Sequence, residues 1–193
     1  MKLFLIARVT GLLTLSTGLS ACGGSAQKYY QLGSDGAAPT GTTGLSVGVG
    51  PVTLPGYVDR AELVFQSGPN EFQVPADAHW TGGLKENISR VLAADLGRRL
   101  HSGNVLAFPW NPDAKLRYQV AVDVSQFHAI SGEGAILEVS WRVLSPNGKT
   151  TIRRGNGSFH ESVVGDGYAA VVLAENRLLA QLADSMAASL RGR

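Results

Sequence analysis

The residues whose spacing most resembles a catalytic or cofactor motif lie near the end of the chain. Gly165, Gly167 and Ala170 fit the G-x-G-x-x-A pattern that brings a helix N-terminus close to a pyrophosphate in dinucleotide-binding folds. That fold needs a further parallel strand after the helix, whereas the residues after this motif read as one helix. We therefore interpret the glycines as turn residues before a helix that Asp166 caps.

The histidines and serines of the chain also form no recognisable metal-binding or catalytic motif. None of the histidines stands in an HExxH or similar ligand pattern; they are His79, His101, His128 and His160. Ser158 follows Gly157, but the residues after it do not complete a G-x-S-x-G elbow. His128 and Glu133 could form an acid/base pair, and a hydrolase built on them is one hypothesis. We predict instead a protein that is not an enzyme and binds no metal or cofactor.

Cys22 is the single cysteine, so the chain can form neither an internal disulfide nor a cysteine metal cluster. It follows a basic start and an apolar stretch over residues 9–19, the layout of an export signal that is too short to span a membrane. Leu19-Ser20-Ala21-Cys22 resembles the lipobox of bacterial lipoproteins. We predict a signal peptide over residues 1–21 and acylation of Cys22; the alternative is an ordinary cleaved signal with an incidental cysteine.

The expected location is the periplasmic face of the outer membrane. Gly23 follows the cysteine, in place of the Asp that resembles an inner-membrane retention signal. An anchor with several acyl chains holds a protein at the bilayer almost permanently, because each buried CH₂ contributes about 0.8 kcal/mol.

Charge and length narrow the remaining classes. The chain has 193 residues with 17 basic and 15 acidic side chains, and Lys2 and Arg8 precede Cys22, so the mature chain is close to neutral. Because no dense cluster of Lys and Arg is present, nucleic acid is not an expected partner. The mature length suits one domain.

Residues 22–44 are rich in Gly, Ser, Ala and Thr, which predicts a flexible tether between the lipid and the domain at residues 45–193. The cluster Tyr29-Tyr30-Gln31-Leu32 is an exception within this tether. We expect it to be the first piece to dock on the folded domain.

Hydrophobic periodicity and turn residues predict the elements of that domain. They are a strand from Leu45 that stops at Pro51, a hairpin of residues 61–66 and 71–74, a helix over 80–102, strands over 105–108, 116–125 and 137–143, a return strand over 150–163, and a helix over 168–190. In the hairpin, Leu63, Phe65, Phe72 and Val74 are expected to reach the core. Gly155 and Gly157 are expected to mark a bulge or bend.

This order predicts an α+β fold, a two-layer sandwich in which two long helices pack on one face of a mostly antiparallel sheet. Apolar residues recur every four positions in the first helix, so their stripe winds around it. One flat sheet would leave part of that stripe open. It would be covered either by the hairpin and tether or by a second copy or another partner.

From about Val47 to the end, the sequence is similar to the ABC-type transport auxiliary lipoproteins, a PqiC/YmbA-like family. The most specific motif is Leu54-Pro55 with Tyr57-Val58-Asp59-Arg60. The other matching pieces are Trp80 opening the first helix, residues 88–92 with Leu96 and Leu100, Pro109-Trp110, residues 118–124 with Phe127, and Trp141.

The resemblance implies an outer-membrane lipoprotein that partners an ABC permease, its ATPase and a periplasm-spanning protein with MCE domains, in a system that moves lipids between the two membranes. Tyr57, Asp59 and Arg60 are the candidate partner interface. The alternative for these residues is a structural corner with Tyr57 packed and Asp59 paired locally with Arg60, because Pro55 and Gly56 already require a tight turn. The alternative for the whole protein is an envelope structural or assembly lipoprotein that binds cell-wall polymer or an outer-membrane machine.

Overall fold

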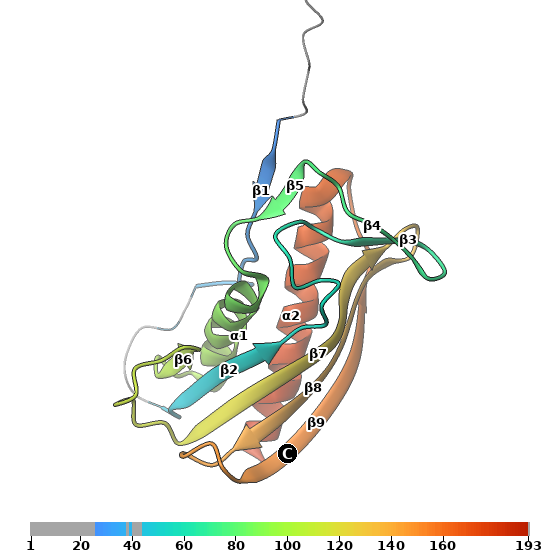
Figure 1. The fold of residues 1–193 in the computed structure, drawn as a ribbon. Helices are drawn as coiled ribbons and strands as arrows, with labels where there is room; N and C mark the ends of the chain where they lie inside the picture. Colours follow the sequence, from blue (N-terminus) through green and yellow to red (C-terminus); the bar gives the residue numbers. More distant parts are fainter. Residues whose placement is uncertain (1–25, 38, 40–43, 193) are drawn as a thin grey trace, which may run out of the picture.

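The computed structural model describes residues 26–37, 39 and 44–192. Cys22 and the predicted signal peptide lie outside these residues. The described chain forms an α+β fold in which two helices cover one face of a mostly antiparallel sheet, as predicted (Figure 1). The elements are β1 (Lys28–Tyr30), β2 (Val47–Thr53), β3 (Phe65–Gly68), β4 (Glu71–Gln73), β5 (Ala78–Trp80), α1 (Leu84–Leu100), β6 (Val105–Ala107), β7 (Tyr118–Ile130), β8 (Gly134–Leu144), β9 (Thr151–Glu161) and α2 (Gly167–Arg191).

Strand β7 organises the main sheet. Strands β8 and β9 follow it in an antiparallel meander. On its other side, β7 pairs in parallel with β2 along its first half and with β3 at its last residues. A bulge between Val124 and Gln126 shifts the alternation, so Phe127 and Ala129 continue the core-facing row that Val120 and Val122 begin.

Two boundaries near the middle of the chain differ from the sequence prediction. Trp80 does not open the first helix, because it ends β5, which pairs with β1, and α1 starts at Leu84. Strand β2 does not stop at Pro51 but continues through a bulge to Thr53. Proline is tolerated there because the bulge already interrupts the ladder of hydrogen bonds.

The predicted hairpin is present but shorter, and its tip does not enter the core. Leu63 is buried, whereas Phe72 and Val74 are 43% and 38% exposed. Phe72 instead packs against Tyr57, with ring centroids 4.9 Å apart. The alternating pattern could not show whether Phe72 would enter the core or stay at the surface, because either face of a short strand can carry an aromatic ring.

The glycines of β9 do not mark a bulge. Gly155 pairs in register with Trp141, and a Cβ on Gly155 would come within 2.3 Å of the Trp141 ring. Gly157 likewise lies under the ring of Phe159. Both positions give an aromatic side chain room to lie across the neighbouring backbone.

A segment that we call the strap, residues 28–36, runs from β1 across both helices. The side chain of Leu32 is buried, its carbonyl accepts a hydrogen bond from Arg90 of α1 at 2.6 Å, and the next amide, of Gly33, donates to Asn176 of α2 at 2.9 Å. The expectation of a flexible tether over residues 22–44 therefore does not describe the strap. The expected docking of the Tyr29-Tyr30-Gln31-Leu32 cluster is confirmed, because Leu32 lies in the core and Tyr30 packs against it.

The stripe of α1 that winds around the helix is covered within this chain. Leu84, Ile88, Leu92 and Leu96 are all buried, and α1 packs on β2 and β6 of the sheet and on α2. This stripe is therefore not available as a self-association face.

Candidate functional site

The motif that carries the family resemblance forms a corner between β2 and β3, residues 54–60, which we call the corner. The amides of Val58 and Asp59 both donate to the carbonyl of Pro55, at 3.1 and 3.2 Å, and close the turn. Leu54 and Val58 point into the core. The corner therefore presents the remaining side chains of the motif at the surface in a fixed geometry.

Tyr57 lies half-buried and begins a chain of hydrogen bonds. Its hydroxyl lies 3.0 Å from Nδ1 of His128 in β7, and Nε2 of His128 lies 3.1 Å from Oε1 of Gln66 in β3. His128 is 1% exposed, so both ring nitrogens need these partners. The three side chains tie the corner, β7 and β3 together.

The side-chain amide of Gln66 determines which atoms donate and which accept in these hydrogen bonds. The Gln66 amide nitrogen donates to the carbonyl of Gly68 at 3.2 Å, so its Oε1 is the atom that faces His128 and it can only accept. His128 must then donate from Nε2, and its Nδ1 must accept from the Tyr57 hydroxyl. Burial lowers the pKa of His128, which favours the neutral ring that this arrangement requires.

Asp59 and Arg60 pair with different residues, not with each other. Asp59 forms an ion pair with Lys85, in the first turn of α1, at 2.6 Å. Arg60 pairs with Glu62 at 2.8 Å and lowers the pKa of that carboxyl. Both members of the predicted interface remain at the surface, where a partner could reach them.

A cavity of about 930 Å³ lies next to this cluster, between the β3–β4 hairpin, the β7–β8 turn and the start of α2. Apolar and polar residues both line it. The apolar or aromatic ones include Phe65, Ile130, Val163, Tyr168 and Val171, and the polar ones Gln66, Gln73, Ser131, Glu133 and Ser162. Its size lies in the range of small-molecule sites. Gln66 joins the cavity to the Tyr57–His128 pair, because it belongs to both.

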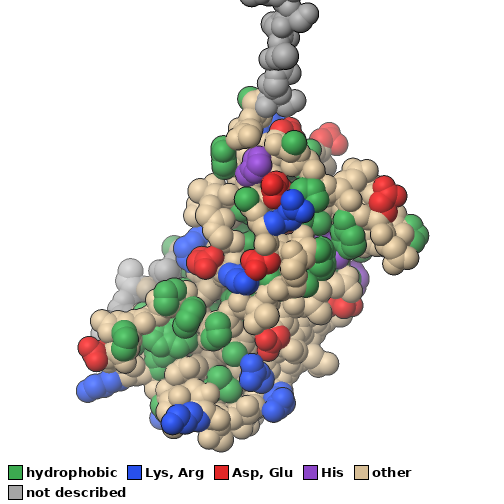
Figure 2. All heavy atoms as spheres, viewed as in Figure 1, with side chains coloured by type: hydrophobic (Ala, Val, Ile, Leu, Met, Phe, Trp, Pro, Cys, Tyr) green, Lys and Arg blue, Asp and Glu red, His purple; other side chains and the backbone are tan. Residues whose placement is uncertain are grey.

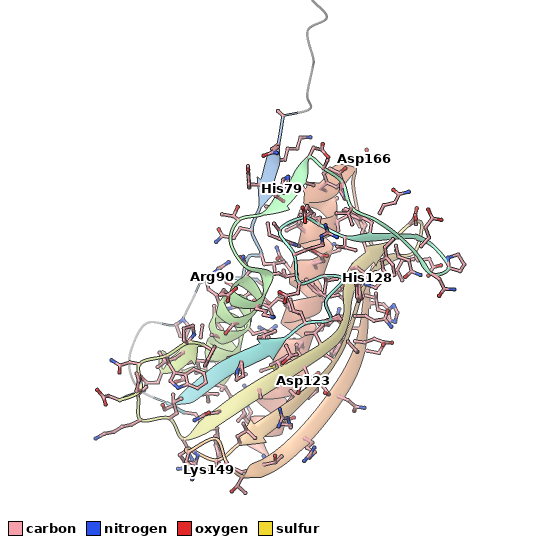
Figure 3. The ribbon with its side chains drawn as sticks, in the orientation of Figure 1. His79, Arg90, Asp123, His128, Lys149 and Asp166 are labelled. Atoms are coloured by element: carbon pink, nitrogen blue, oxygen red, sulfur yellow. The ribbon has the colours of Figure 1, made fainter. Side chains whose placement is uncertain are left out.

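The cavity lies at the end of the molecule where the described N-terminus begins. Tyr168 lines it and places its hydroxyl 3.4 Å from Asp77, whose carbonyl accepts from the Lys28 amide at 2.7 Å. Figure 3 shows Asp166 and His79 at this same end and Lys149 at the opposite end.

The acid/base pair considered from the sequence does not form. The ring of His128 is fully engaged by Tyr57 and Gln66, while Glu133 stands in the β7–β8 turn at the cavity. Asp166 does occupy the N-cap position of α2, but its side chain makes no capping hydrogen bond. Gly165 and Gly167 adopt positive φ, of 100° and 75°, as turn residues do.

Within residues 26–37, 39 and 44–192, no three His, Cys, Asp or Glu side chains gather as metal ligands would. No helix in these same ranges is both long and apolar enough to cross a membrane.

Charged side chains hold the strap, and no sequence pattern indicated these pairs. The Asp35 carboxylate pairs with Arg98 and, at 3.1 Å, with Arg99, both near the end of α1. The Asp35 amide donates to Oδ1 of the fully buried Asp95 at 3.1 Å, which also accepts from Arg98 at 2.7 Å. Arg99 continues to Asp184 of α2 at 2.5 Å.

Two solved structures share this fold. One is a crystal structure of an uncharacterised protein, 21% identical, covering 86% of this chain and 99% of its own, with a TM-score of 0.66. The other, from Xanthomonas campestris and assigned to the DUF330 family, is 15% identical, covers 84% of this chain and 94% of its own, and also has a TM-score of 0.66. No curated protein matches the sequence significantly.

One family profile matches a continuous span that contains both the corner motif and the core positions around it. The profile of the ABC-type transport auxiliary lipoprotein component matches residues 30–187. This span runs from the end of β1 in the strap through nearly all of α2. The chain therefore belongs to the ABC-type transport auxiliary lipoprotein family.

Proposed function

We propose that this protein is a non-enzymatic accessory subunit of an MCE-type ABC transport system that moves lipids between the inner and outer membranes. In this proposal, acylated Cys22 holds it at the outer membrane and its body faces the periplasm. The observation that supports the proposal most is the family match over residues 30–187, combined with a strap that fixes the segment following Cys22 to the helices.

The proposal gives the strap a mechanical role. A lipid at Cys22 pulls on the chain at Lys28, where β1 pairs with β5. The load then passes through Leu32 and Asp35 to α1 and through Gly33 to α2. A body held in this way keeps one end toward the bilayer, so its other surfaces are presented to partners in a constant orientation.

Crosslinking in the native envelope tests the partnership. Tagged full-length protein is expected to capture an MCE-domain protein together with the permease and ATPase. Capture of peptidoglycan fragments or of an outer-membrane assembly machine instead would support the alternative, an envelope structural lipoprotein. Intact-mass spectrometry of the same material is expected to show acylated Cys22, and an unmodified thiol would contradict the anchor.

We propose the corner as the partner-binding surface. Asp59 and Arg60 are exposed on a turn whose backbone is fixed by its own hydrogen bonds. The ring of Phe72, which packs on Tyr57 of the corner, adds an exposed apolar side chain to this surface. Charged and aromatic side chains side by side are typical of interface hot spots.

Arg60→Glu is expected to reduce capture of the MCE protein at least tenfold. Arg142→Glu is the matched control, since the side chains of Arg60 and Arg142 are both 42% exposed and each pairs with one carboxylate. Equal capture by both variants would show that the corner is only structural.

A further inference from the structure

Residues of two kinds line the cavity beside the corner. Phe65, Ile130, Tyr168 and Val171 are apolar or aromatic, whereas Gln73, Ser131 and Ser162 are polar and Glu133 is acidic. Among the described residues that line it, Glu133 is the only charged one. A complementary ligand therefore has a long apolar part and a polar head. A charged head should carry a positive group that pairs with Glu133.

The position of the cavity points to the source of such a ligand. Tyr168 lines the cavity and is joined to the start of β1 through Asp77. If Cys22 carries the anchor, the six residues from Cys22 to Lys28 span at most about 20 Å when fully extended. The cavity is thus held close to the bilayer surface, where acyl chains are the most concentrated apolar ligand.

Exposed apolar residues mark the same end of the molecule. Tyr29, Phe72, Val74 and Val164 are 64%, 43%, 38% and 75% exposed, and each belongs to β1, the β3–β4 hairpin or the segment between β9 and α2. Aromatic and aliphatic side chains of this kind favour the interface between lipid headgroups and hydrocarbon. Val74 also lines the cavity.

From this geometry we infer that the cavity binds one acyl chain of a zwitterionic phospholipid drawn from the bilayer. The acyl chain contacts the apolar lining residues such as Phe65 and Val171, the ester groups contact the glutamines and serines, and an ammonium headgroup pairs with Glu133. This inference rests on the proposed anchoring at Cys22. It adds a site at which the subunit itself contacts lipid.

Photocrosslinking tests the site. Acylated full-length protein is reconstituted in phosphatidylethanolamine vesicles that contain a trace of the same lipid with a diazirine at the end of one acyl chain. Adducts are expected on peptides that carry Phe65, Tyr168 or Val171. Val163→Trp, which fills the cavity, should lower adduct yield about tenfold, whereas Ile152→Trp, at the far end of β9 and 46% exposed, should not change it.

A second variant avoids any risk to the core. Glu133 is exposed in a turn, so Glu133→Lys should fold normally. It should weaken labelling by the phosphatidylethanolamine probe several-fold and strengthen labelling by a phosphatidylglycerol probe. If each probe labelled Glu133→Lys and the parent protein equally, the assignment of the headgroup would be overturned.

The source of the acyl chain is tested with Cys22→Ser protein, which carries no anchor. If this protein is labelled in the cavity but the acylated protein is not, the anchor itself fills the site and the inference is wrong. Absence of cavity adducts in both proteins also overturns it. Because capture of the MCE protein is measured separately, loss of labelling with intact capture would leave the proposed function standing.

Discussion

The strap and the corner both cross the outside of the same α+β body, yet they are fixed by different forces. The strap is held by Asp35, Arg98 and Arg99 and by the buried carboxylate of Asp95. The corner is held by a neutral relay from Tyr57 through His128 to Gln66. The strap should therefore respond to charge removal and to salt, and the corner to acid.

The difference suits the two roles proposed for these regions. Ion pairs act over a range of geometries, so a segment under tension from a membrane can shift slightly without losing them. Hydrogen bonds between buried neutral groups weaken steeply with misalignment. They fix one geometry, which is what a recognition surface needs.

The largest expected effect is the loss of Asp95. Asp95→Ala leaves the Arg98 guanidinium and the Asp35 amide without their buried acceptor, and each donor left unsatisfied costs about 1–3 kcal/mol. The loss is reduced at pH 7 because Arg98 keeps Asp35 as a partner and because burial, which raises the pKa of Asp95 to about 6, already disfavours its carboxylate. Urea unfolding at pH 7 measures the change. Asp184→Ala is the control, because the Asp184 side chain is 67% exposed, and its loss should cost about 1 kcal/mol or less.

Glu175 of α2 is a buried acid that belongs to neither the strap nor the corner. It can be compared with Asp95, which is buried with partners. Glu175 is 3% exposed and its Oε2 has no hydrogen-bond partner among the described residues. Burial raises its pKa from 4.5 to about 8, whereas Asp95, which has partners, reaches only about 6. Without a partner, Glu175 is held as the neutral acid at pH 7.

The pKa of Glu175 is higher in the folded protein than in the unfolded chain. Its contribution to the free energy of unfolding is therefore fully present below pH 4.5 and is lost as pH rises toward 8. Each pH unit in this window removes about 1.4 kcal/mol. Glu175→Met is therefore expected to stabilise the protein at pH 7 by roughly 3 kcal/mol and to flatten the pH profile. Urea unfolding from pH 5 to 8 checks this, and a less stable variant at pH 7 would contradict it.

Breaking the corner relay should have an intermediate effect. Tyr57→Phe leaves Nδ1 of the buried His128 without a donor, which costs about 1–3 kcal/mol. The pKa of His128 is lowered from 6.5, so its stabilising contribution is present above pH 6.5 and is lost as pH falls below it.

The acid effect is best measured as the difference in stability between Glu175→Met and Glu175→Met/His128→Gln. Asp95, whose pKa is about 6, titrates in the opposite direction in the same range, but it does so in both proteins and cancels in the difference. The difference should shrink between pH 6.5 and pH 5, and adding His160→Gln, at a surface histidine of β9, to both proteins should leave that change in place. A difference that does not vary with pH would show that His128 does not titrate in this range.

The smallest effect is that of salt. At 1 M NaCl the Debye length falls to about 3 Å, and the partly exposed Asp35 pairs should lose about 1 kcal/mol or less. Hydrogen exchange at the Gly33 and Asp35 amides should quicken up to about fivefold, while the Val58 and Asp59 amides of the corner stay unchanged. Equal acceleration in both regions would remove the distinction between them.

The sequence predicted the elements whose periodicity is local. The helix over 168–190 corresponds to α2 at Gly167–Arg191, and the Asn147-Gly148 turn joins β8 and β9 as expected, with Gly148 donating to Ser145 at 2.8 Å. Strand β7 was underestimated at its end, since the bulge after Val124 breaks the alternation that marked it.

What the sequence could not predict depends on contacts between distant residues. The strap looks like a linker by composition, and only Leu32 and the rings near it hinted that it docks. The relay joins Tyr57, Gln66 and His128 from three separate segments. The corner motif was visible, but its partners Lys85 and Glu62 were not.

Hydrophobic side chains also gather over β2 and β6, at the far side of the body from the cavity (Figure 2). Leu106 and Phe108 are 38% and 43% exposed there, and Phe108 meets Trp110 edge-on with ring centroids 5.3 Å apart. A Cβ on Gly48 would come within 2.8 Å of the Trp110 ring, so this glycine lets the indole lie on β2. The Pro109-Trp110 piece of the family resemblance thus has a packing role.

The parallel pairing of β2 with β7 has a consequence for biogenesis. β2 lies early in the chain, and its partner becomes available only after α1 and β6 have followed. If the chain is exported as proposed, it enters the membrane pore from its N-terminus and cannot pair β2 with β7 while β7 is still on the other side. The sheet should then close only after the second half of the chain has arrived.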